Sequence, residues 1–116
     1  MAKITIYHNH ACGNSRGAMQ LLRDRGVEFD VIEYLETPPT REELEKILAM
    51  LEGPAADLVR KDKRFAELGL KADDYLEQKK IVALLLEHPE LMQRPVVVKS
   101  SRAIIARPPE KLSALL

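Results

Sequence analysis

The sequence predicts an α/β domain built on a four-stranded mixed sheet, and two groups of residues carry this prediction. Near the N-terminus, a β-branched run at residues 4–7 precedes apolar residues at helical spacing between 18 and 22, and a second strand-like run follows at 29–34. Near the C-terminus, the runs 95–98 and 103–106 flank a short polar turn. The first group predicts two parallel strands joined by a helix, and the second predicts an antiparallel hairpin.

The residues between these two groups, about 40–90, are predicted to form a helical insert within the same domain. Thr40 and Glu43 have the spacing of a capping box at the start of a helix. The apolar stripe of that helix is Leu44, Ile47, Leu48 and Leu51. Further helical segments are predicted from Gly53 to Arg60, at 65–68 and from about Asp74 to Glu87, with a last short helix that opens at Pro108 and buries Leu112, Leu115 and Leu116.

This order of elements is that of a thioredoxin-like domain, in which helices cover both faces of the sheet. The chain has 116 residues, which suits one compact domain spanning residues 1–116. By analogy with that fold, Pro95 stands where a cis-proline lies beside the active site.

The charges of the chain cancel, but they are unevenly distributed. Residues 1–27 carry a net charge of +3, residues 28–90 of −7 and residues 91–116 of +4. If the two basic ends fold together, they can form a positive site in a neutral protein. The overall balance disfavours a general nucleic-acid binder. The longest apolar run, 81–86, is too short to cross a membrane, and no signal-peptide pattern is present.

Cys12 is the only cysteine, and it lies where the first predicted strand ends and the first helix begins. A single cysteine excludes an internal disulfide and fits a reducing cytoplasm. Such a residue can be an inert buried side chain, but here the free amides of Gly13, Asn14 and Ser15 are expected to favour a thiolate. Because Ser15 stands where a second cysteine would resolve an adduct, a thiol from another molecule must release anything bound to Cys12.

Other side chains could act on this cysteine. His8 could donate toward the sulfur and lower the pKa of Cys12, or it could bond to backbone at the strand end. His8, His10 and Cys12 alternate, which in an extended chain places three potential metal ligands on one face, but no fourth ligand is evident, so no metal site is predicted. Arg94 and Arg107 each precede a proline beside the late strands, and arginines that converge on a helix N-terminus form an oxyanion site.

Several segments together resemble the glutaredoxin-coupled arsenate reductase family, and the resemblance covers essentially the whole chain. These segments are Ile6-Tyr7-His8-Asn9, Ala11-Cys12-Gly13, Ser15-Arg16, residues 34–40, residues 58–61, His88-Pro89, residues 94–98 and Arg107-Pro108. The resemblance implies a thioredoxin-like fold with a helical insert, in agreement with the pattern above. One departure is His10, which stands where the family commonly has proline.

The resemblance also implies residue roles and a reaction. Cys12 corresponds to the nucleophile, His8 to the residue that favours its thiolate, and Arg60, Arg94 and Arg107 to three arginines that hold the oxyanion. The implied partners are arsenate, glutathione as co-substrate and glutaredoxin, with no bound cofactor. The thiolate attacks arsenate and water leaves; glutathione then adds, glutaredoxin reduces the mixed species, and arsenite is released. Two alternatives remain, a glutathione-linked thiol oxidoreductase with another substrate and a non-enzymatic regulatory binding module.

Overall fold

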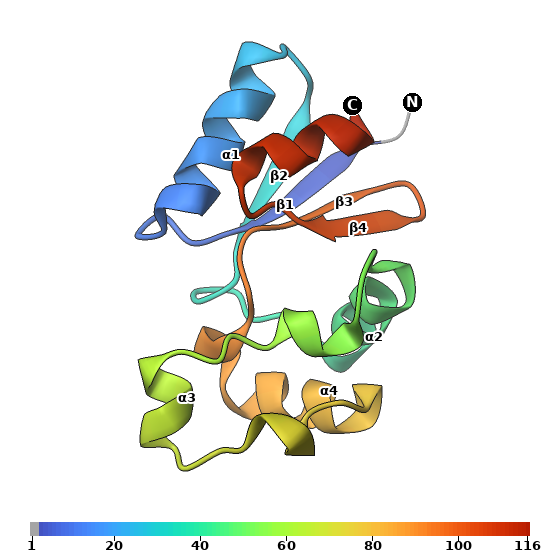
Figure 1. Cartoon of the computed structure of the whole chain (residues 1–116). Coiled ribbons are helices and arrows are strands. Elements are labelled where there is room, and N and C mark those ends of the chain that lie inside the picture. Colours follow the sequence, from blue (N-terminus) through green and yellow to red (C-terminus); the bar gives the residue numbers. More distant parts are fainter. Residues whose placement is uncertain (1–2) are drawn as a thin grey trace.

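The computed structural model of the protein describes residues 3–116, which surround a sheet with strand order β2-β1-β3-β4 (Figure 1). The strands are β1 (Ile4–His8), β2 (Phe29–Glu33), β3 (Val96–Lys99) and β4 (Arg102–Ile105). Strand β1 pairs in parallel with β2 and antiparallel with β3, and β3 pairs antiparallel with β4. The predicted four-stranded mixed sheet is therefore confirmed.

Helix α1 (Gly13–Asp24) and the 3-10 helix η4 (Pro109–Leu115) cover one face of this sheet (Figure 1). Ile6, Val97 and Ile104 lie opposite one another on β1, β3 and β4, and they share a core with buried leucines of α1 and η4. Gly17 allows α1 and η4 to come together, since a Cβ at this position would lie 2.9 Å from the Cγ atom of Pro109. The short helix that was predicted to open at Pro108 is this 3-10 helix η4, and it buries Leu112 and Leu115.

The opposite face of the sheet packs against the helical insert. Because side chains alternate along a strand, Tyr7 and Val96 point to this second face and join the core of the insert. In Figure 1 the insert lies on the far side of the sheet from α1 and η4. Its helical elements are α2 (Arg41–Met50), η1 (Ala55–Leu58), α3 (Lys63–Glu67), η2 (Ala72–Asp74), α4 (Gln78–Glu87) and η3 (Pro89–Leu91).

The insert is also attached to the outer strand β4. Helix α2 starts with the predicted capping box of Thr40 and Glu43, and its last residue is Met50. Leu51 was expected to continue the helical stripe, but it is extended and forms a parallel bridge with Ala103. The next residue, Glu52, donates its N–H to the Ala103 carbonyl at 2.9 Å, and its carboxylate forms a two-point ion pair with Arg102. Pairing with β4 therefore ends the helix at Met50, one residue before Leu51.

Two further helix predictions were wrong in their bounds, because tertiary contacts outweigh local pattern. The helix expected from about Asp74 begins at Gln78, since Tyr75 turns inward and packs edge-to-face on Phe65 at a ring distance of 5.9 Å. The helix expected to reach Arg60 ends at Leu58. The next two residues are extended instead: Val59 bridges to Met92, and the Arg60 N–H donates to the Leu91 carbonyl at 2.7 Å.

None of the helices formed by residues 3–116 is long and apolar enough to cross a membrane.

Candidate active site

Cys12 occupies the N-cap position of helix α1, directly after the loop that leaves β1. Its N–H donates to the Asn9 carbonyl at 3.0 Å, and its own carbonyl accepts the Arg16 N–H at 3.0 Å. The side chain is 9 % exposed. The thiol thus sits at the end of the helix where backbone N–H groups have no partner within the helix, and where negative charge is stabilised.

The surroundings of Cys12 lower the pKa of its thiol. Burial alone raises this pKa, because it disfavours the charged form. Hydrogen bonds from the backbone N–H groups of Ser15 and Asn14, together with the Arg94 guanidinium, outweigh the burial and leave the pKa below its ordinary value. A larger share of the sulfur is therefore thiolate at neutral pH than in a free cysteine.

Two arginines from the C-terminal part of the chain lie beside this sulfur. Arg107 Nη1 is 3.6 Å from Cys12 Sγ, and it also donates to the Arg94 carbonyl at 3.0 Å. Each arginine precedes a cis peptide bond, to Pro95 and to Pro108, so the proline expected to be cis by analogy is cis. The Ala106 N–H donates to the Pro95 carbonyl at 3.0 Å, which holds the two segments together. The basic C-terminal segment thus meets the N-terminal helix as its charge pattern suggested.

His8 does not make the hydrogen bond to Cys12 that the sequence left open. Its Nδ1 is 2.7 Å from Ser15 Oγ, and this Oγ also accepts the Asn9 N–H at 3.0 Å. Burial is the largest influence on the pKa of the His8 ring and lowers it, which favours the neutral ring. A neutral ring can accept the Ser15 hydroxyl proton at Nδ1. His8 therefore contacts the first turn of α1, and reaches Cys12 through Ser15.

Arg60 lies on the extended segment that runs beside residues 91–93, close in the fold to Arg94. Its Nε donates to the Asp62 carboxylate at 2.7 Å. The structure thus brings Arg94 and Arg107 to the cysteine, while the Arg60 guanidinium is bound by Asp62, two residues further along the chain. Contact between Arg60 and a bound oxyanion stays a prediction.

Tyr34 and Asn9 belong to this site although the sequence did not single them out. Tyr34 is fully buried, and its hydroxyl and the Arg94 Nε have no hydrogen-bond partner within residues 3–116. Burial raises the pKa of Tyr34, and the nearby Arg94 guanidinium acts against that rise. The parallel register of β1 and β2 could have revealed that Asn9 and Tyr34 are neighbours. His8 lies opposite Glu33, so the next residues, Asn9 and Tyr34, leave the sheet side by side.

No group of three or more His, Cys, Asp and Glu side chains able to hold a metal ion occurs in the described part of the chain. His10, which alternates with His8 and Cys12 in sequence, is exposed and lies with Nδ1 3.3 Å from the Glu33 carboxylate. Its ring therefore pairs with Glu33 at the surface.

Comparison with known proteins agrees with this geometry. Residues 7–115 match the model of the ArsC family. The chain belongs to the ArsC family. It is 42 % identical over 117 residues to the arsenate reductase of Escherichia coli K12, covering all of this chain and 82 % of that protein.

Two further relatives match the chain over nearly its full length. It is 37 % identical over 118 residues to the arsenate reductase of Neisseria meningitidis serogroup A, covering both proteins completely. Among solved structures, an arsenate reductase from Vibrio cholerae superposes with a TM-score of 0.88 at 36 % identity, covering 99 % of this chain and 98 % of that one. The thioredoxin-like fold of this ArsC protein is therefore confirmed.

The lowered pKa of Cys12 predicts fast alkylation at neutral pH. The rate of reaction with iodoacetamide should rise with pH to a midpoint below about 8.5, the value for a free thiol. Arg94→Ala should move this midpoint upward, because it removes a positive charge that favours the thiolate. Stopped-time alkylation measured by mass spectrometry gives both midpoints. Arg64→Ala, on α3, serves as the control, and a wild-type midpoint at or above the free-thiol value would contradict the prediction.

The buried Ser15 hydroxyl predicts a large stability effect in this ArsC protein. Ser15→Ala should lower the free energy of unfolding by about 1–3 kcal/mol, since it leaves the Asn9 N–H and His8 Nδ1 buried without a partner. Urea denaturation followed by circular dichroism measures the loss. Ser101→Ala, exposed in the turn between β3 and β4, is the matched control. Equal losses for the two variants would show that the hydrogen bonds of Ser15 do not stabilise the fold.

Proposed function

We propose that this protein reduces arsenate to arsenite, with Cys12 as the nucleophile and with glutathione and glutaredoxin as the sources of reducing thiols. One observation carries the proposal: a thiol of lowered pKa at the N-terminus of α1, with the guanidinium groups of Arg94 and Arg107 beside it. The names of the relatives at 37–42 % identity support arsenate as the substrate. Two guanidinium groups repel each other, and an anion bound between them offsets this repulsion.

The site has the features that attack on a tetrahedral oxyanion requires. Arsenate carries several negative oxygens, and the helix N-terminus and two guanidinium groups are the groups that proteins use to hold such anions. The Cys12 thiolate attacks the arsenic atom and forms a sulfur–arsenic bond. One oxygen of arsenate takes up protons, its bond to arsenic breaks, and this oxygen leaves as water. The product is a thioarsenate ester on Cys12, formed without any change in the oxidation state of arsenic. The arginines keep the remaining oxygens in place during this exchange.

The reduction itself needs a second thiol, which this chain does not contain. Cys12 is its only cysteine, and Ser15 occupies the position from which a second thiol could attack. Glutathione therefore adds to the adduct, and glutaredoxin reduces the mixed species as arsenite leaves. In total, one arsenate and two thiols give one arsenite, one disulfide and one water, so the two electrons gained by arsenic come from the two sulfurs. Such thiol chemistry suits the reducing cytoplasm.

The proposal predicts arsenate-dependent oxidation of NADPH in a coupled assay. The assay contains glutathione, glutathione reductase, glutaredoxin and arsenate, and it follows the fall in absorbance of NADPH. Wild-type protein should give a rate that depends on both arsenate and glutaredoxin, whereas Cys12→Ser should give none, because serine cannot form the thioarsenate ester. If wild-type protein oxidises NADPH at the same rate with and without arsenate, arsenate is not its substrate. A rate with a mixed-disulfide substrate in its place would then indicate the alternative thiol oxidoreductase.

The contact between Arg107 and the sulfur predicts a second result in the same assay. Arg107→Ala should lower kcat/KM for arsenate about 10- to 150-fold, which corresponds to the loss of about 1.5–3 kcal/mol for a charge-assisted hydrogen bond. Arg107→Lys should restore only part of this loss, because an ammonium lacks the two-pronged geometry of a guanidinium. Arg64→Ala, paired with Glu90 away from the site, should leave kcat/KM unchanged. Full activity of Arg107→Ala would remove Arg107 from the oxyanion site.

A further inference from the structure

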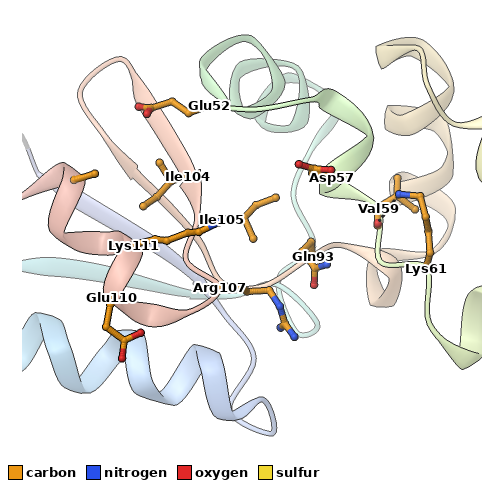
Figure 2. Close-up of a pocket in the computed structure, with 11 residues that line it drawn as sticks. Glu52, Asp57, Val59, Lys61, Gln93, Ile104, Ile105, Arg107, Glu110 and Lys111 are labelled. Carbon is orange, nitrogen blue, oxygen red and sulfur yellow. Dashed lines mark hydrogen bonds between the residues drawn. The ribbon is translucent and has the colours of Figure 1, made fainter.

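A cavity of about 700 Å³ lies between the C-terminal segment and the helical insert, and neither the fold nor the oxyanion site accounts for it (Figure 2). One wall comes from β4 and η4, with Ile104, Ile105 and Lys111. The other wall comes from the insert, with Asp57 and Lys61 among its residues. Its volume falls within the range of pockets that hold small organic ligands, and it is far larger than an oxyanion needs.

The cavity adjoins the reactive cysteine through a shared side chain. Arg107 lines the cavity, and in Figure 2 its side chain stands at the lower edge, between the two walls. The same side chain has its Nη1 atom 3.6 Å from Cys12 Sγ. A molecule that fills the cavity therefore comes within reach of whatever Cys12 carries.

The charges around the cavity suit a ligand that carries both signs. Within residues 3–116, Asp57 and Lys111 take part in no ion pair. The Lys61 ammonium is fixed in position by the carbonyls of Ala56 and Val59, at 2.8 and 3.2 Å, which leave its positive charge uncompensated. All three residues are exposed, so their charged groups are accessible to a ligand of complementary charge, which attracts and orients them without breaking an ion pair of the protein.

The charged residues that line the cavity determine its net charge. Glu52 is already paired with Arg102, so its carboxylate is compensated. The other charged residues that line the cavity are the cations Lys61, Arg107 and Lys111 and the acids Asp57 and Glu110. They sum to a single positive charge, which complements a ligand with two carboxylates and one ammonium group. Ile104 and Ile105 add an apolar surface for an uncharged stem.

We propose that this cavity binds the small peptide thiol that reduces the Cys12 adduct, a zwitterion of the glutathione class. Lys61 and Lys111 bind its two carboxylates, Asp57 binds its ammonium group, and Ile105 contacts the stem that carries the thiol. The thiol then points toward Arg107 and the sulfur of Cys12. This inference rests on the proposed function for the identity of the thiol, and it adds the place where that thiol is held.

A binding experiment without arsenate tests the site directly. S-methylglutathione, which cannot react with Cys12, is titrated into ¹⁵N-labelled full-length protein. Amide signals of Ile104, Ile105 and Lys111 should shift, and Lys111→Glu and Asp57→Lys should each weaken binding at least about tenfold, since each reverses one charge contact. Lys79→Glu, exposed on α4 and outside the cavity, should bind as wild type does. Shifts confined to other residues, or wild-type affinity in both cavity variants, would overturn the proposal.

A kinetic experiment separates this inference from the proposed function. In the coupled assay, Lys111→Glu should raise KM for glutathione about tenfold and leave KM for arsenate unchanged. If wild-type protein reduces arsenate but Lys111→Glu keeps its KM for glutathione, the function stands and the cavity is not the thiol site. If S-methylglutathione binds in the cavity and arsenate is not reduced, the cavity is a peptide-thiol site and the substrate of the enzyme is another compound. Circular dichroism of each variant shows that the chain remains folded.

Discussion

The antiparallel pairing of β1 with β3 is the contact on which the rest of the site depends. It sets Tyr7 opposite Val96, so the residues that follow β1 and those that precede β3 leave the sheet at the same end of these strands. The first group contains Cys12 and the second contains Arg94, although more than eighty positions separate them in the chain. Strand β4 of the hairpin runs back to this end of the sheet, where Arg107 follows it. A register shift between β1 and β3 would turn every side chain to the opposite face and separate the thiol from both guanidinium groups.

Local pattern in the sequence was enough for the sheet, the first helix and the capping box, because strand runs, turn residues and a Thr-x-x-Glu spacing act over a few neighbouring residues. It was not enough for Val59 and Arg60, whose extended conformation depends on pairing with residues 91–93. The start of α4 likewise depends on the contact between Tyr75 and Phe65. Contacts of this kind join distant segments, and no local pattern contains them.

The candidate site also combines features that local sequence predicts with features that depend on contacts between distant segments. The helix N-terminus at Cys12 follows from chain order alone, and its effect on the thiol pKa could be anticipated. The partner of His8 could not, because a histidine seven residues from Ser15 meets it only after the loop folds back on α1. Tyr34 was missed since a tyrosine at a strand end usually reads as core. The parallel register places Tyr34 beside Asn9, but its contact with Arg94 appears only in the folded structure.

The shallow exposure of Cys12 also restricts which molecules can touch it. With 9 % of its surface open and guanidinium groups beside the sulfur, Cys12 admits an anion or a slender thiol but excludes the convex surface of a folded protein. A protein reductant can take electrons to this site only by way of a small molecule that has already entered. In the proposed reaction, the burial of Cys12 therefore places the small thiol before the protein thiol, and the same burial disfavours disulfides with cysteines on the surfaces of other proteins.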